Sequence, residues 1–332
     1  MTKLSFLDLV NVVEGEEPAD AIRRVGPVAA HVEACGYHRY WVAEHHGLSG
    51  VAAAATALII AEAGHATSRI RIGSGGIMLP NHSPLVIAEQ FGTLDALFPG
   101  RIDLGLGRAP GADNRVARAL RRDFMREAEE FPRNVIELRA HFTGEPDVGI
   151  LAVPGRGAPV EMWILGSSLF GAQLAAALGM PYAFASHFAP DLLDEALMIY
   201  RRDFRPSAHL REPYAAAAMS AIAADTAAEA DYVASSMMQN FVALRTGRPG
   251  KLPPPVENYG ASLDPAIGEM LGRVLQCSSF GTQEDVARGI KRFIARTQVD
   301  EVIVHSPTYD PAARLRSITL IARAFESLQV GA

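Results

Sequence analysis

Short apolar runs alternate with longer helical patterns along the chain, and this alternation constrains the fold more than any other feature of the sequence. Strands separated by helices are typical of parallel sheets, because a crossover must bring the chain back before the next strand can begin. Eight strand–helix pairs in this order predict an α/β fold, a closed (β/α)8 or TIM barrel with loop insertions. The expected strands cover residues 4–10, 39–44, 69–79, 101–107, 161–165, 180–186, 214–225 and 301–306.

The expected helices cover residues 18–36, 51–65, 84–98, 114–142, 168–179, 190–205, 226–245, 282–296 and 311–328. Two stretches rich in Gly and Pro interrupt the pattern, at 144–160 and 247–262, and the second is long enough to act as a lid. An open, doubly wound sheet is the competing architecture, but no G-x-G-x-x-G motif follows the first strand. Nothing divides the chain in two, so residues 1–332 are expected to form a single domain.

Composition indicates which partners this protein is not expected to bind and in which compartment it is expected. Hydrophobic residues make up 49% of the chain and charged residues 20%, which indicates a globular protein with a large core. The net charge is −6 and there is no basic run, which argues against nucleic acid or an anionic membrane as a partner. Cys35 and Cys277 match no metal spacing and suit a reducing cytoplasm. The apolar run before Asp8 is too short for a signal peptide or a membrane span.

Barrel enzymes carry their chemistry where strands end and the following loops begin. His, Ser, Arg and Gly are concentrated at these positions. The expected strand ends carry Asp8, Glu44-His45-His46, Gly75-Gly76, Gly107-Arg108, Gly166-Ser167-Ser168, Ser186-His187 and His305-Ser306.

Two neighbouring strand ends carry groups suited to phosphate. Ser167 and Ser168 open a helix after a glycine, where backbone N–H groups and small side chains favour an anion. Arg108 ends the preceding strand, and a guanidinium offers phosphate a planar, bidentate partner. Either feature alone has an ordinary interpretation, as an N-cap or as a surface arginine. Together they make a phosphate site the stronger interpretation.

Glycines also end the third strand. Gly75 and Gly76 would allow a flat ligand to approach the backbone closely, although a bulge or tight turn is a common alternative.

The run Glu44-His45-His46 is compatible with a metal site, with acid–base chemistry and with a polar loop. Adjacent side chains of a strand point to opposite faces, so a metal would need a further ligand. His82, His187 and His305 are available, but none stands at a recognisable metal spacing. A histidine that exchanges a proton or hydrogen bond with a ligand is therefore favoured over a metal.

Several long motifs occur in one order: VAEHHG at 42–47, GSGGIMLPNHSPLVIAEQFGTLDALFPGRIDLGLGRAPGAD at 73–113, WILGSSLFGAQLAAALGMPYAFASHF at 163–188 and VDEVIVHSPTYDPAARLRSITLIARAF at 299–325. Over residues 4–328 the chain resembles the bacterial luciferase-like flavin monooxygenase family. The resemblance implies a (β/α)8 enzyme, usually a homodimer, that inserts one oxygen atom from O2 into an organic substrate. It also implies reduced FMN (FMNH2) delivered by a separate flavin reductase, with O2 activated as a flavin C4a-hydroperoxide.

The resemblance assigns roles to individual residues. His45 would be the catalytic residue, with Glu44 and His46 supporting it. Arg108, Ser167 and Ser168 would bind the FMN phosphate. The Gly75–Gly76 link corresponds to a non-prolyl cis peptide beside the flavin ring. Gly107 stands where luciferase has a reactive cysteine, which argues against light emission from an aldehyde.

The substrate pocket is expected to be lined by Met78, His187, Phe188 and Tyr259, which suggests a bulky or aromatic molecule such as a polyketide-type metabolite. Three alternatives remain open: a deazaflavin (F420)-dependent oxidoreductase on the same fold, a non-catalytic flavin-binding protein, and a metal hydrolase.

Overall fold

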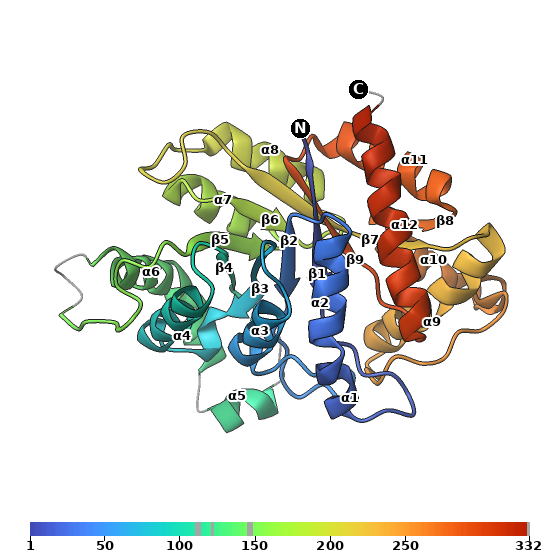
Figure 1. The fold of residues 1–332 in the computed structure, drawn as a ribbon, viewed down its shortest axis with the longest axis horizontal. Coiled ribbons are helices and arrows are strands. Elements are labelled where there is room, and N and C mark those ends of the chain that lie inside the picture. Colours follow the sequence, from blue (N-terminus) through green and yellow to red (C-terminus); the bar gives the residue numbers. More distant parts are fainter. Residues whose placement is uncertain (110–113, 121–122, 145–148, 331–332) are drawn as a thin grey trace.

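The computed structural model describes residues 1–109, 114–120, 123–144 and 149–330. Eight parallel strands form a closed barrel surrounded by helices, which confirms the predicted fold (Figure 1). Strands β1 to β7 pair in chain order, and β9 closes the barrel between β7 and β1. The barrel strands are β1 (Lys3–Asp8), β2 (Arg39–Val42), β3 (Arg71–Met78), β4 (Ile102–Gly107), β5 (Glu161–Gly166), β6 (Tyr182–Phe184), β7 (Ala215–Ala223) and β9 (Glu301–His305).

The helices pack around the outside of the barrel (Figure 1). None of the described helices combines the length and the apolar character that crossing a bilayer would require. The described α-helices are α1 (Pro18–Arg23), α2 (Val25–Ala34), α3 (Thr56–His65), α4 (Pro84–Leu97), α5 (Asn114–Leu120), α6 (Phe124–Thr143), α7 (Leu169–Leu178), α8 (Leu193–Asp203), α9 (Ala227–Arg245), α10 (Pro265–Val274), α11 (Gln283–Thr297) and α12 (Pro311–Val330).

One helix and one strand depart from the predicted alternation. Helix α10 and strand β8 (Ser278–Gly281) stand between α9 and α11, so the strict succession of eight strand–helix pairs is wrong there. β8 pairs with the end of β7, from Ser220↔Ser278 to Ala223↔Gly281. Its sequence, Ser-Ser-Phe-Gly, is too short and too polar to form a recognisable apolar run.

The predicted helix 18–36 is also two helices. α1 ends at Arg23 and α2 begins at Val25. Pro27 has no N–H to bond the carbonyl of Arg23, four residues earlier, so a continuous helix would lack that bond. The predicted helix 114–142 is likewise divided into α5 and α6, and residues 121–122 between them lie outside the described residues.

A layer of charged side chains fills the barrel at the amino-terminal ends of the strands. Arg39 lies 2.8 Å from Asp103, 3.1 Å from Glu301 and 3.0 Å from Glu161. We call these four residues the charged floor. The Arg39 side chain is 3% exposed, and those of Asp103 and Glu301 are fully buried. Because these charges have lost water, their mutual attraction and hydrogen bonds must replace it.

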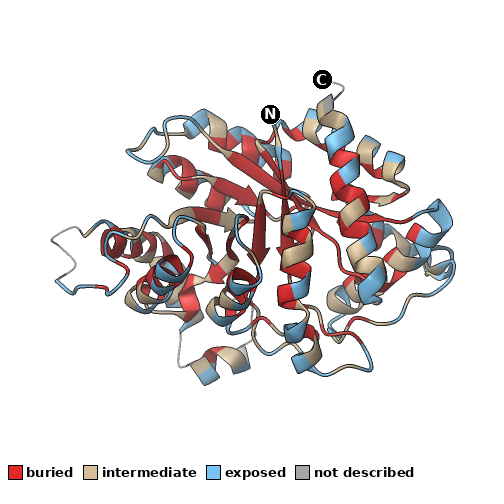
Figure 2. Cartoon of the chain, viewed as in Figure 1, coloured by how far each residue is buried: buried red, intermediate tan, exposed pale blue. Residues whose placement is uncertain are grey.

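An apolar layer lies directly above the charged floor. Trp41 and Trp163 pack edge to face with ring centroids 5.1 Å apart, and Nε1 of Trp41 donates a hydrogen bond to Asp103 at 3.0 Å. Ala183 and Ala218 belong to the same buried cluster and contribute only methyl groups. Figure 2 shows the barrel strands buried along most of their length. The small residues leave space on the side of the tryptophans that faces the carboxyl ends of the strands.

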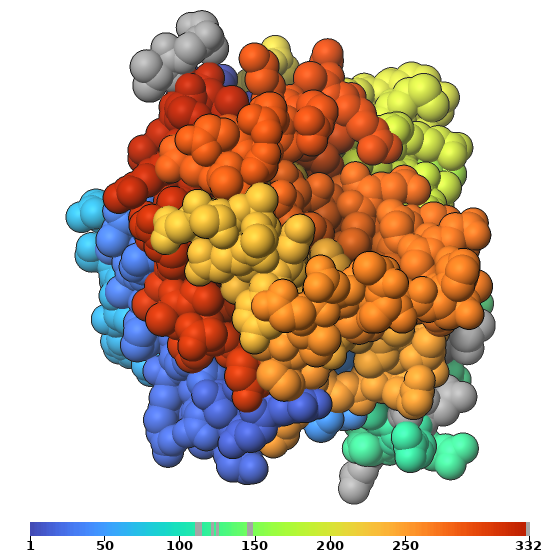
Figure 3. All heavy atoms as spheres, turned by 90° about the vertical axis from the view of Figure 1, so that its right-hand side faces the viewer, coloured from blue at the N-terminus to red at the C-terminus, as the bar shows by residue number. Residues whose placement is uncertain are grey.

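The Gly- and Pro-rich segment 247–262 is anchored over part of its length. The N–H of Leu252 donates to Val12 O at 2.8 Å, and the N–H of Glu14 donates to Leu252 O at 2.9 Å. Farther along, the N–H of Val256 donates to Ser235 Oγ on α9 at 2.7 Å. The segment lies with α9 and α10 on one face of the molecule (Figure 3). These bonds would have to break before residues 252–256 could move as a lid.

Candidate active site

Glu44 gathers polar groups at the carboxyl ends of β2 and β3. Its Oε1 pairs with Nε2 of His46 at 2.6 Å and with Nε2 of His82 at 2.8 Å. Its Oε2 accepts a hydrogen bond from the N–H of Met78 at 3.0 Å. Burial alone would raise the pKa of this carboxyl, but the hydrogen bonds from His46 and His82 lower it to about 2. Glu44 is therefore an ionised anchor, 1% exposed, for the two loops it joins.

The same residue connects those loops to the glycines of β3. The backbone N–H of Glu44 donates to Gly76 O at 3.4 Å, and Asn81 Nδ2 donates to Glu44 Oε1 at 3.2 Å. His45, which follows Glu44 directly, is thus held in place by its neighbour. Sequence reasoning named His82 only as a spare metal ligand and overlooked Asn81. Their signal was the polar run Pro-Asn-His-Ser after a glycine-rich strand end.

The ligand atoms of Glu44, His46 and His82 all lie within 4.8 Å of one another, close enough for the three to hold a metal ion. The direct carboxylate–imidazole hydrogen bonds account for the same geometry without an ion. The arrangement can therefore act as a hydrogen-bonded brace, and metal analysis would distinguish the two.

Three imidazoles meet at the carboxyl end of the barrel. His45 follows β2, His187 follows β6, and His305 is the last residue of β9. The rings of His187 and His305 have centroids 5.3 Å apart. Burial, together with the neighbouring His45, lowers the pKa of His187 to about 4, and burial also lowers the pKa of His45. The sequence indicated His305 as a strand-end residue and as an available metal ligand. The alternation of side chains along β9 was the signal that it faces inward.

The Gly75–Gly76 peptide is cis in the structure. A Cβ added to Gly75 would lie 2.8 Å from Cδ1 of Leu7 and 3.0 Å from Cβ of Trp41, and one added to Gly76 would lie 2.5 Å from Gly105 O. Only glycine fits these two positions without movement of the barrel. Neither glycine adds a side chain, and Gly75 lines a pocket, so a flat ligand could approach this peptide closely.

Arg108 and the start of α7 lie together. β4 and β5 pair with Gly107 opposite Leu165, which places the two strand ends side by side. The guanidinium carbon of Arg108 lies 4.1 Å from the ring centroid of Phe170, in the first turn of α7. Ser168 is the N-cap residue of that helix, and its side chain makes no capping hydrogen bond. An exposed arginine beside free N-terminal N–H groups can bind a phosphate.

An apolar pocket lies inside the mouth of the barrel. His187 is the polar side chain among its walls, and Gly75 contributes backbone. Its lining residues are Leu7, Trp41, Gly75, Leu165, Ala183, Phe184, Ala185, His187, Ala218 and Ile303.

Of the four residues expected in the substrate pocket, the structure places one in this wall, His187. Met78 ends β3 beside Glu44 and is partly buried. Phe188 is 38% exposed, and the guanidinium carbon of Arg245 lies 4.8 Å from the centroid of the Phe188 ring. Tyr259 packs in the cluster between α9 and α10. None of these three side chains therefore lines the pocket.

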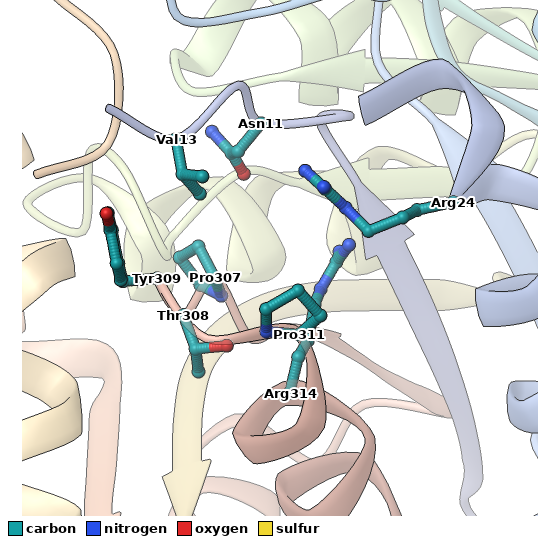
Figure 4. Close-up of a pocket in the computed structure, with 8 residues that line it drawn as sticks. All are labelled: Asn11, Val13, Arg24, Pro307, Thr308, Tyr309, Pro311 and Arg314. Carbon is teal, nitrogen blue, oxygen red and sulfur yellow. The ribbon is translucent and has the colours of Figure 1, made fainter. Parts of the chain in front are cut away.

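A second hollow lies beyond the barrel mouth, between the β1–α1 connection and the start of α12 (Figure 4). Arg24 and Arg314 point into it. Each arginine already has an acidic partner, because Arg24 pairs with Glu16 at 2.5 Å and Arg314 with Asp8 at 2.8 Å. This hollow consequently offers little excess charge for an anion.

Several known proteins are similar to this chain over most of its length. The sequence pattern of the family described as luciferase-like monooxygenase matches residues 2–301. A luciferase-like monooxygenase of Escherichia coli (strain K12) is 47% identical over 325 residues, covering 98% of this chain and 97% of its own. The N-acetyl-S-alkylcysteine monooxygenase of Bacillus subtilis (strain 168) is 32% identical, covering 98% of both chains.

Solved structures show the same fold. The crystal structure of apo-MsnO8 superposes with a TM-score of 0.86 at 32% identity, covering 98% of this chain and 99% of its own. The oxygenating constituent of 3,6-diketocamphane monooxygenase, in complex with FMN, has a TM-score of 0.72 at 17% identity and covers 98% of both chains. With the family pattern spanning most of its length, this chain belongs to the luciferase-like monooxygenases, a family of oxidoreductases.

Proposed function

We propose that this chain is the oxygenase of a two-component system, in which a separate flavin reductase supplies FMNH2. The enzyme would insert one oxygen atom from O2 into a small organic substrate. The observation that carries this proposal is the apolar pocket lined by Gly75 and His187, with the exposed Arg108 close to the start of α7. A flat ring with a phosphate tail matches that combination.

The residues present fit FMN. Its phosphate would bind Arg108 and the backbone and hydroxyl groups of Ser167 and Ser168, while its ring would lie against Gly75 and Gly76. Reduced FMN supplies the electrons that activate O2, a chemistry beyond the reach of side chains.

The chain itself would position the reactants, exclude water from the pocket, and supply a proton donor or acceptor. Leu7, Trp41 and Leu165 line the pocket and exclude water, which strengthens every polar interaction inside it. His45 would hold or move a proton at the reacting oxygen, since its lowered pKa keeps the imidazole neutral near pH 7. Glu44, braced by His46 and His82, would position His45.

The substrate is expected to be uncharged at its reacting end and to have an apolar body. A bulky or aromatic molecule, including a polyketide-type metabolite, would require Phe188 and Tyr259 to approach the pocket as the segment 247–262 closes. The B. subtilis relative is named for N-acetyl-S-alkylcysteine, a small organic molecule, and this supports the general substrate class. We further propose a cytoplasmic homodimer.

The direct test supplies the protein with FMN, a flavin reductase and NADH, and screens organic compounds by mass spectrometry for a gain of one oxygen atom. We expect a product that depends on O2 and on the reductase. If no compound gains oxygen, while reduced F420 binds and exchanges a hydride, the deazaflavin alternative replaces this proposal. A protein that binds FMN but yields no product with either cofactor would be a flavin-binding protein.

A further inference from the structure

Two histidines at the barrel mouth have ring nitrogens that bond to no other group in the described part of the protein. Among the described residues, Nδ1 of His187 and both ring nitrogens of His305 are buried without a hydrogen-bond partner. His305 is 5% exposed. A buried polar atom left unpaired is destabilising, and nearly all such atoms in folded proteins have partners. Two adjacent rings with three unpaired nitrogens therefore indicate a place where a ligand completes the bonds.

The neighbours of His305 do not satisfy it. The charged groups that influence His305 are Arg314 and Asp8, which bond each other at 2.8 Å. Asp8 also accepts hydrogen bonds from Tyr40 Oη at 2.6 Å and from the N–H of Val10 at 2.7 Å. The carboxylate is thus engaged with other donors. The imidazole of His305 keeps both nitrogens unpaired within the described part of the chain and packs against His187, whose side chain lines the pocket.

Both rings are neutral at physiological pH. Burial lowers the pKa of His187 to about 4, and burial with the nearby His187 and Arg314 lowers the pKa of His305 well below its usual value. A neutral imidazole offers one N–H donor and one acceptor nitrogen. The pair therefore presents donors and acceptors without net charge.

The walls beside the pair are apolar and small. Ala183, Ala185 and Ala218 line the pocket next to His187, and Ile303 precedes His305 by one inward-facing position on β9. A carboxylate or phosphate here would have to lose its water to neutral donors and methyl groups, which is unfavourable. Desolvating an amide, alcohol or carbonyl would cost much less free energy, and such a group could bond the N–H donor or the acceptor nitrogen of the rings.

We propose that His187 and His305 form a recognition pair that binds an uncharged hydrogen-bonding group of the substrate, such as an amide, alcohol or carbonyl. This inference rests on the proposed oxygenase function and deepens it, since it names the chemical class of the substrate group. The pair determines specificity, whereas His45 serves the reacting oxygen.

The test uses the flavin-free protein and two probes of equal length, hexanamide and hexanoate, titrated by calorimetry at pH 7. We expect hexanamide to bind at least tenfold more tightly than hexanoate. His305→Phe, which keeps a ring but removes both nitrogens, should weaken hexanamide about tenfold, the effect of losing one or two hydrogen bonds. His305→Gln, which keeps a donor and an acceptor, should restore most of the affinity. His209→Phe, at an exposed histidine outside the site, is the matched control.

Each variant is also titrated with FMN and checked by circular dichroism for folding. Unchanged FMN affinity in His305→Phe is the expected result, and it separates the recognition pair from the flavin site. The proposal is overturned if hexanoate binds as tightly as hexanamide, if hexanamide does not bind, or if His305→Phe weakens FMN rather than hexanamide. Failure of the oxygenase function is measured separately, as loss of FMN binding or of oxygen incorporation in the wild-type protein.

Discussion

At the scale of single residues, the site depends on one buried carboxylate. Glu44 is 1% exposed and bonds two imidazoles, one amide side chain and one backbone N–H. Its folded pKa of about 2 lies below the ordinary value of 4.5, so the ionised form stabilises the fold. That contribution is fully present above pH 4.5 and is lost as the pH falls toward 2.

Replacing Glu44 with Gln should remove this contribution. The depression of the pKa corresponds to about 3 kcal/mol of stability near pH 7. We expect urea unfolding to show Glu44→Gln less stable by about that amount at pH 7, with a smaller difference at pH 3. Glu212→Gln, at an exposed carboxyl, should change little at either pH. A deficit that stays constant from pH 7 to pH 3 would contradict the assigned role of the carboxylate charge.

The role of His45 can be separated from cofactor binding. Because His45 is proposed to serve the reacting oxygen rather than the flavin phosphate, His45→Ala should retain FMN affinity within about twofold and lose about 100-fold in product formation. Flavin fluorescence and product yield measure the two effects. His209→Ala is the control, and full turnover by His45→Ala would remove His45 from the chemistry.

Arg108, unlike His45, is expected to contribute to FMN binding. Its charge-assisted bonds to phosphate contribute about 1.5–3 kcal/mol, so Arg108→Ala should weaken FMN binding by about 10- to 100-fold. The same substitution should leave riboflavin, which lacks the phosphate, almost unaffected. Arg211→Ala, at an exposed arginine, serves as the control. An equal loss for FMN and riboflavin would place Arg108 elsewhere than at the phosphate.

At the scale of secondary-structure elements, the end of β3 is fixed by what surrounds it. A methyl group on Gly75 would overlap Leu7 and Trp41, and the backbone of the neighbouring strand leaves equally little room at Gly76. The strand end is thus shaped by contacts from β1, β2 and β4. Glycine there is a packing requirement as well as a feature of the site.

Gly75→Ala should therefore destabilise the barrel by about 1–3 kcal/mol, the usual cost of overpacking a core. The matched control is Gly268→Ala in α10, where an added Cβ meets no atom within 4 Å. Alanine in that helix should stabilise the protein by about 0.5–1 kcal/mol. Thermal unfolding of the two variants should shift in opposite directions, and a neutral Gly75→Ala would contradict the tight packing.

Elements with a clear pattern could be predicted from the sequence, and elements that depend on tertiary contacts could not. All eight barrel strands were expected, because their inward and outward faces are both buried and form recognisable apolar runs. β8 was missed because four residues become a strand only through pairing with β7. Likewise the pairing of Glu44 with His82, and of His187 with His305, joins distant segments whose proximity no local pattern records.

At the scale of the whole molecule, the charged floor and Ser5 link five barrel strands through ion pairs and hydrogen bonds. Arg39 on β2 contacts acidic residues on β4, β5 and β9, while Ser5 on β1 bonds Glu301. Removing Arg39 takes away the cation that pairs with the buried Glu301, whereas Asp103 and Glu161 keep Arg71.

Arg39→Leu should consequently destabilise the protein by about 3–5 kcal/mol. Arg23→Leu, which removes an exposed i,i+3 pair with Asp20, should cost less than about 1 kcal/mol. Chemical denaturation of both variants at pH 7 makes the comparison. If Arg39→Leu is as stable as the wild type, the barrel tolerates a buried Glu301 carboxylate without its cation, contrary to this account.

The layering of the barrel interior has a consequence for how such proteins diverge. The charged residues that join the strands lie at one end, and the imidazole of His187 and the alanines that line the pocket lie at the other. Substitutions at the mouth can change which compound is oxidised without touching the base. Descendants of one ancestral barrel can therefore acquire new substrates in small steps, each of which leaves a folded and heritable enzyme.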